Sequence, residues 1–182
     1  MLAPTAVGAI WYYMYTPSGV VNTIASALTG ISIDFAFLYE PLSVTPAILT
    51  TFVWQSLGIS MVLLLLGLAG IPRDTIEAAR VDGASGRQVL WHVILPQLAP
   101  TMIVVTILNV AAGFTTFDLL WVMGSDYPGK RSLSLAVYMY FESFSKGGWA
   151  LGCAVAVVLG ATVIGATALL ACLQSYVEKR VR

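Results

Sequence analysis

Three long stretches of this sequence contain no Asp, Glu, Lys or Arg, and they limit the folds that the chain can adopt. They run from 42 to 71, from 89 to 116 and from 148 to 176. Each exceeds the roughly 20 apolar residues with which an α-helix crosses the hydrocarbon core of a membrane. The whole chain is 58% hydrophobic and 10% charged, whereas soluble domains average roughly 45–50% and 25%. We therefore predict an all-α, polytopic bundle of membrane helices.

The hydropathy pattern predicts four spanning segments, at about 2–15, 47–71, 96–122 and 149–176. The first is short and is interpreted as the tail of a span, so the bundle is expected to be N-terminally short, with about four spans. Between the first two spans, Val20–Leu28 is predicted to form a short interfacial helix that Gly30 ends. Small residues within the spans predict close helix packing, at Gly58, Gly67, Gly113, Gly160 and Gly165.

Lysine and arginine are distributed unequally between the two sides of the predicted bundle. One side holds the loop between the second and third spans together with the C-terminal tail, with Arg73, Arg80, Arg87, Lys179, Arg180 and Arg182. The opposite side holds Lys130, Arg131 and Lys146. Because basic residues concentrate in cytoplasmic loops, this excess places the first side in the cytoplasm.

The loop between the second and third spans is predicted to be a helix, a turn and a second helix. Asp74 with Glu77 and Ser85 with Gln88 each have the spacing of a capping box. The first helix is expected over 75–84, and the second from Gly86 to near Pro96. The small surface of Ala78, Ala79 and Val81 fits a groove on another protein. An amphipathic helix that rests on lipid headgroups explains the same pattern.

Several classes of site are disfavoured by what the sequence lacks. A net charge of zero gives no sign of a nucleic-acid surface. Cys153 and Cys172 lie in one predicted helix, roughly 28 Å apart, which is too far for a disulfide. His92 is the only histidine, so no metal-binding spacing exists. Neither a P-loop nor the H-E-x-x-H and G-x-S-x-G motifs of enzymes occur, so the chain is not expected to be an enzyme.

The segment Glu77-Ala78-Ala79-Arg80-Val81-Asp82-Gly83-Ala84, with Ile94-Leu95-Pro96 and Pro100 after it, resembles the EAA loop of ABC importer permeases. Other segments resemble motifs of the carbohydrate branch of that family, the maltose and glycerol-phosphate type: Gly19-Val20-Val21-Asn22, Leu68-Ala69-Gly70-Ile71-Pro72, Phe114-Thr115-Thr116-Phe117-Asp118 and Tyr138-Met139-Tyr140 with Phe144. Gly124-Ser125-Asp126-Tyr127-Pro128-Gly129 departs from the T-G-G-G-P of many members, and six spans are typical of the family.

This resemblance implies that residues 1–182 form part of a type I ABC importer transmembrane domain, in a bacterial or archaeal inner membrane. Residues 72–97 would be its cytoplasmic coupling loop, which docks on a dimer of ATP-binding subunits through Glu77, Ala78, Ala79, Arg80, Asp82, Gly83 and Ala84. Gly83 would permit a turn that a β-carbon makes costly. ATP and Mg²⁺ would be bound by that subunit, with no cofactor on this chain. A second permease subunit and an extracytoplasmic solute-binding protein would complete the importer.

A solute path is predicted from polar and aromatic residues in the spans. Asn109, Gly113, Thr116 and Phe117 have helical spacing on one face of the third span, with Asp118 near its end and Gln55 in the second span. Hydroxyl-binding and ring-stacking groups suit a sugar. Hydrogen bonding between helices is the alternative for Asn109 and Gln55. A secondary transporter or channel subunit remains the alternative function, although such proteins commonly use ionisable residues inside their spans.

Overall fold

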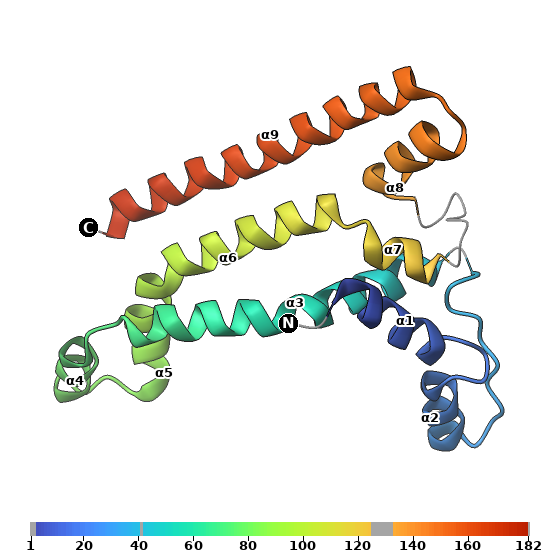
Figure 1. The fold of residues 1–182 in the computed structure, drawn as a ribbon. Coiled ribbons are helices and arrows are strands. Elements are labelled where there is room, and N and C mark those ends of the chain that lie inside the picture. Colours follow the sequence, from blue (N-terminus) through green and yellow to red (C-terminus); the bar gives the residue numbers. More distant parts are fainter. Residues whose placement is uncertain (1–2, 41, 125–132, 182) are drawn as a thin grey trace. The chain divides into compact units, whose positions relative to one another are not determined.

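All regular structure in the described residues, 3–40, 42–124 and 133–181 of the computed structural model, is helical (Figure 1). This confirms the predicted all-α class. The helices are α1 (Pro4–Met14), α2 (Val20–Thr29), α3 (Val44–Ala69), α4 (Arg73–Val81), α5 (Gly86–Val89), η1 (Leu90–Ile94), α6 (Leu95–Thr115), α7 (Asp118–Met123), α8 (Leu135–Tyr140), η2 (Phe141–Ser145) and α9 (Trp149–Val181). The prefix η marks a π-helical turn.

Three helices in the described part of the chain are long and apolar enough to cross a membrane. They are α3 with 26 residues, the continuous helix Gly86–Thr115 with 30, and Trp149–Cys172 of α9 with 24. Almost no residue in the most apolar windows of these helices is buried within the chain, as expected where lipid or another subunit covers them. The first predicted span forms only α1, whose 11 residues extend about 16 Å, roughly half of the hydrocarbon core.

The chain divides into two compact units, and the first comprises residues 1–56 and 113–161. Its core forms where α1 packs against α7 and the start of α3. A β-carbon at Gly8 would lie 3.2 Å from Val122 Cβ, so the missing side chain lets α1 and α7 approach closely. The buried core residues are Val7, Tyr15, Val44, Ala47, Ile48, Leu119 and Met123.

Helix α2 confirms the prediction of a short helix that ends at Gly30. Gly30 has φ 70°, and its N–H donates to the Ser26 carbonyl oxygen at 2.9 Å. The side chain of Asn22 is buried, and its Nδ2 donates to the carbonyl oxygens of Thr16, Pro17 and Phe35. Asn22 therefore holds the preceding turn and the following loop to α2.

The predicted third span, 96–122, is wrong as one continuous helix, since α6 ends at Thr115 and α7 begins at Asp118. Ser134 Oγ donates to the Thr116 carbonyl oxygen at 3.3 Å, so this carbonyl in the break has a partner from α8's N-cap. A hydropathy window does not detect the break, because apolar residues lie on both sides of it.

The second unit comprises residues 57–112 and 162–182. Within it α3 and α6 approach closely at Gly67, where a β-carbon would lie 2.6 Å from Thr101 Oγ1. The predicted packing role is thus confirmed for Gly67. For Gly58, Gly160 and Gly165 it stays a prediction, because no described atom lies within 4 Å of a β-carbon placed there.

The predicted end of the second loop helix near Pro96 is also wrong. The helix that begins at Gly86 continues through Pro96 and Pro100 to Thr115. Proline lacks an N–H donor, and its ring crowds the carbonyl of the preceding turn. Here the π-helical turn Leu90–Ile94 widens the helix just before Pro96, which accommodates the ring without ending the helix.

Candidate functional site

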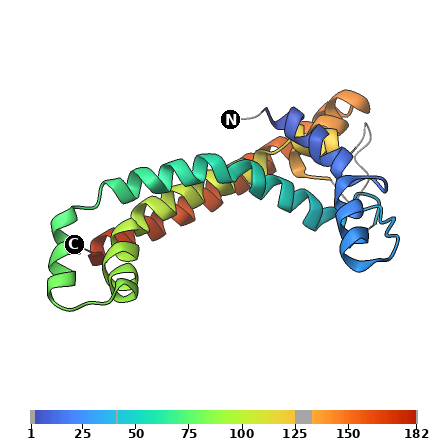
Figure 2. The ribbon, with the colours of Figure 1, turned by 90° about the horizontal axis from the view of Figure 1, so that it is seen from below.

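The loop between α3 and α6 is the candidate site with the most specific sequence pattern, and it forms a compact helical hairpin at one end of these helices (Figure 2). The predicted capping box at Ser85 is confirmed: Ser85 N–H donates to Gln88 Oε1 at 2.8 Å, and Gln88 N–H donates to Ser85 Oγ at 3.4 Å. The box predicted at Asp74 is wrong. Helix α4 begins at Arg73, directly after Pro72, so Asp74 lies in its first turn. A carboxylate in the first turn interacts favourably with the positive end of the helix dipole.

Gly83 produces the turn between the two loop helices. Its φ is +84°, a left-handed conformation that costs residues with a β-carbon roughly 1–2 kcal/mol. Three hydrogen bonds close the C-terminus of α4: Asp82 N–H to Ala78 O at 3.0 Å, Gly83 N–H to Arg80 O at 3.1 Å and Ala84 N–H to Ala79 O at 3.0 Å. The predicted role of Gly83 in a turn that disfavours a β-carbon is confirmed.

Helix α4 has a half-buried side that faces the rest of the loop and an exposed side. It contacts α5 and η1, and Ile76 and Ala79 are its half-buried residues. On the other side Ala78 is exposed, and Val81 is 87% exposed. The predicted common surface of Ala78, Ala79 and Val81 is therefore wrong, because 100° per residue turns Ala79 toward the loop. An exposed valine beside an exposed alanine leaves an apolar contact surface without a partner in the described residues.

The charges around this surface are free for contacts outside the loop. Glu77, Arg80 and Asp82 are exposed. In the described part of the chain the ion pair recorded is Lys146 with Glu142, which lies in the first unit. The role of residues Glu77 to Ala84 toward an ATP-binding subunit stays a prediction.

The hydrogen bonds of Asn109 bear on its two predicted roles, solute binding and hydrogen bonding between helices. Its Nδ2 donates to Ser60 Oγ of α3 at 2.9 Å and to the Val105 carbonyl oxygen at 2.8 Å. The first bond joins two membrane-length helices, which is the interhelical role. Both N–H groups are used in this way, so only Oδ1 remains for a solute. These contacts favour the structural role, and solute binding by Asn109 stays a prediction.

We expect Asn109→Ala and Ser60→Ala to be coupled in a double-mutant cycle. Interhelical hydrogen bonds in membranes average about 0.6 kcal/mol. The double variant should therefore lose about 0.6 kcal/mol less unfolding free energy than the sum of the losses in the two single variants. Unfolding in detergent measures this, and Thr106→Ala is the control because its hydroxyl bonds only within α6, to Met102 O. Strictly additive effects would refute the contact.

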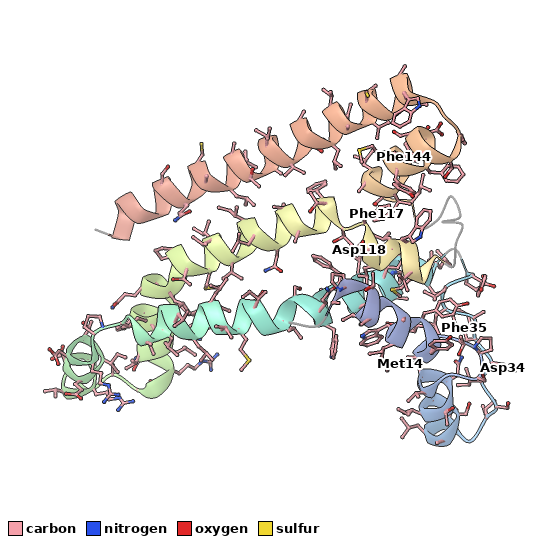
Figure 3. The ribbon with its side chains drawn as sticks, viewed as in Figure 1. Met14, Asp34, Phe35, Phe117, Asp118 and Phe144 are labelled. Atoms are coloured by element: carbon pink, nitrogen blue, oxygen red, sulfur yellow. The ribbon has the colours of Figure 1, made fainter. Side chains whose placement is uncertain are left out.

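The other predicted path residues lie in the first unit, and all of them except Gln55 are at or next to the break between α6 and α7. Thr116 and Phe117 are outside both helices, so the predicted helical face that they share with Asn109 is wrong. A β-carbon on Gly113 would lie 3.6 Å from Phe52 Cζ. Asp118 is exposed in the first turn of α7, beside Phe117 (Figure 3). Gln55 is half-buried in α3.

An aromatic cluster continues from Phe117, and the sequence reasoning did not assemble it. The Phe117 and Trp121 rings stack with their centroids 5.5 Å apart. The centroid of the Tyr140 ring lies 5.1 Å from that of Phe117 and 5.2 Å from that of Trp121. Phe144 lies 5.0 Å from Tyr140 and 5.1 Å from Trp149. Phe144 is marked in Figure 3. The spacing of four between Phe117 and Trp121, and between Tyr140 and Phe144, was the available signal.

Comparison with known proteins identifies the family. The model of the family described as "binding-protein-dependent transport system inner membrane component" matches residues 13–182. The chain belongs to this family. As a member, it is an inner-membrane component, in agreement with the three membrane-length apolar helices in its described residues. A metal site has no support in the described residues, where no three His, Cys, Asp or Glu side chains gather.

Related proteins of known type cover nearly the whole chain. A probable ABC transporter permease of Pyrococcus horikoshii is 34% identical over 82% of this chain and 52% of its own length. The sn-glycerol-3-phosphate transport system permease of Brucella suis is 30% identical over 99% and 60%. The trehalose/maltose transport system permease of Thermococcus litoralis is 34% identical over 90% and 55%. This chain thus spans little more than half the length of these relatives.

A solved structure shows the same fold. The crystal structure of a bacterial ABC transporter involved in the import of the acidic polysaccharide alginate matches with a TM-score of 0.82 at 18% identity, covering 97% of this chain and 62% of the other. A second structure of the bacterial alginate transporter, in complex with an alginate pentasaccharide-bound periplasmic protein, matches with a TM-score of 0.82. The expected fold of an ABC importer transmembrane domain is therefore confirmed.

Proposed function

We propose that this chain is a membrane-spanning permease subunit of an ATP-driven ABC importer. It translocates a sugar or a related small polar solute that an extracytoplasmic binding protein delivers. Family membership and the relatives for glycerol-3-phosphate and trehalose/maltose support this class of solute. On this proposal residues 1–182 are part of an ABC type-1 transmembrane domain, with 72–97 as its coupling loop.

The proposal rests on the exposed face of α4, which belongs to the loop that connects two membrane-length helices in the sequence. Val81 is 87% exposed, and Glu77, Arg80 and Asp82 surround it without ion pairs in the described residues. A face with an apolar centre and a charged rim has the anatomy of a protein interface. A cytoplasmic ATP-binding subunit is the partner, present as a dimer with ATP and Mg²⁺ bound to it. A second permease subunit completes the path.

The orientation belongs to the same proposal. The coupling loop and the C-terminus lie in the cytoplasm, as the excess of Lys and Arg on that side favours. Lys130 and Arg131, which the sequence pattern assigns to the opposite side, fall outside the described residues. Attaching a membrane-impermeant thiol reagent to Arg87→Cys from either side of sealed vesicles tests this orientation.

The test of the function is a charge reversal in the coupling loop. We expect Glu77→Lys to reduce co-purification of the ATP-binding subunit and ATP-driven uptake at least about tenfold, a loss of about 1.4 kcal/mol. Membrane insertion should be unchanged, because Glu77 is exposed and lies outside the membrane-length helices.

The matched control for that test is Glu40→Lys, the same charge reversal at an exposed glutamate far from the loop in sequence. This variant should keep the ATP-binding subunit. Normal uptake by the Glu77→Lys protein at normal expression would contradict the coupling role, and an unmodified chain that never retains an ATP-binding subunit would contradict the function itself.

A further inference from the structure

An open notch lies where the turn after α4 meets the helix that follows it. It has a volume of about 390 Å³ and is lined by Asp82, Gly83, Ala84, Gln88, His92 and Val93. The notch exists because the left-handed backbone at Gly83, φ +84°, returns the chain so that α4 contacts α5 and η1. Its walls are therefore set by the turn and by one side of the next helix.

The hydrogen bond of His92 determines which group its ring presents. His92 Nδ1 lies 3.1 Å from the Gln88 carbonyl oxygen. A carbonyl oxygen only accepts, so Nδ1 carries the hydrogen in this contact. In the neutral imidazole the other nitrogen, Nε2, then has a lone pair and acts as an acceptor. The ring is exposed, so Nε2 is available to a group that enters the notch.

Asp82 adds a negative charge to the same notch. It is exposed and takes part in no ion pair in the described residues. The side-chain oxygen of Gln88 is already bonded to Ser85. No lysine or arginine is among the six residues that line the notch. The notch thus presents a carboxylate and a ring acceptor, a combination that complements a cationic side chain rich in N–H donors.

We propose that this notch receives an arginine or lysine side chain of the cytoplasmic ATP-binding subunit. This inference rests on the proposed function and adds a second contact, in which the partner's side chain enters the permease. The carboxylate of Asp82 repels the phosphate of a lipid headgroup, which disfavours the membrane as the occupant. One carboxylate is too few for a calcium ion, which takes six to eight oxygen ligands. The neighbouring exposed Val81 supplies the apolar part of the same contact.

The experiment measures how tightly the ATP-binding subunit associates with the full chain in its assembled complex, in lipid nanodiscs. We expect Asp82→Asn to weaken association about fivefold, as for a partly exposed ion pair worth up to about 1 kcal/mol. His92→Lys places a permanent cation in the notch and should weaken it at least as much. His92→Gln keeps an acceptor and should retain association. Asp34→Asn, an exposed aspartate in the loop after α2, is the charge-matched control.

A rescue identifies the occupant. In the Asp82→Lys background, the exposed arginines and lysines of the ATP-binding subunit are changed to glutamate one at a time, and one of these changes should restore association. Unchanged association in both Asp82→Asn and His92→Lys, or rescue by none of the changes, would overturn the notch contact while leaving the proposed function standing. If the unmodified chain itself does not bind the ATP-binding subunit, the proposed function fails, and the notch contact with it.

Discussion

Replacing Gly83 by valine is expected to uncouple the permease from its ATP-binding subunit while leaving membrane insertion unchanged. Gly83 has φ +84°, and a β-carbon there meets no atom within 4 Å. The cost is therefore conformational, about 1–3 kcal/mol for a left-handed non-glycine residue, and a β-branched side chain is among the worst placed in this region. The turn should rearrange and move α4 away from its present position on α5 and η1.

Association of the ATP-binding subunit with the Gly83→Val chain should fall about tenfold or more, which is at least about 1.4 kcal/mol. Binding in nanodiscs and ATP-driven uptake measure this. Two glycines provide controls. Gly30→Val introduces the same kind of strain, at φ 70° in another part of the chain, and Gly86→Ala lies in the first turn of α5 with open space around it. Both should bind as the unmodified chain does, and equal losses in all three would contradict the prediction.

Gly67→Ala is expected to destabilise the second unit, because it places a β-carbon between two membrane-length helices. That atom would lie 2.6 Å from Thr101 Oγ1, 2.8 Å from Thr101 Cγ2 and 2.9 Å from Leu98 Cδ1. Threonine is stiff at χ1 and cannot easily withdraw. Overpacking of this kind costs about 1–3 kcal/mol, so the free energy of unfolding in detergent should fall by that amount.

Two variants show whether the close approach is responsible. Gly58→Ala in the same helix has no atom within 4 Å, and it should be neutral or slightly stabilising because alanine is favoured over glycine in helices by about 1 kcal/mol. Thr101→Ala combined with Gly67→Ala removes two of the three close atoms and should restore most of the loss. Equal effects of Gly58→Ala and Gly67→Ala would indicate that α3 and α6 do not approach here.

Much of the loop between α3 and α6 was predictable because local rules decide it. The glycine turn and the Ser85 capping box each depend on a few neighbouring residues, and both are present as predicted. The Asp74 box is absent because α4 begins at Arg73 with Pro72 at the N-cap position, so Asp74 lies inside the helix. The faces of α4 were assigned incorrectly because a nine-residue helix with two adjacent alanines gives no signal for which one turns toward α5.

The solute path was less predictable, because it depends on contacts between segments that are distant in sequence. Asn109 is spaced regularly from Gly113, Thr116 and Phe117, but α6 ends before Thr116. The Nδ2 of Asn109 donates a hydrogen bond to Ser60 Oγ, 49 residues away in the sequence. Likewise Tyr140 meets Phe117 and Trp121 only because α7 and α8 come together. No local pattern contains these distances.

The sequence was sufficient to show that this chain is an all-helical membrane protein and to predict a turn at Gly83 in the loop between two spans. Both follow from free energies that act locally: the cost of charge in lipid and the cost of a β-carbon at a left-handed turn. The packed structure was needed to see where α6 stops, that Pro96 lies within a continuous helix, and which side of α4 is exposed. These depend on packing and on hydrogen bonds between segments far apart in the chain, such as Ser134 to Thr116 and Asn109 to Ser60.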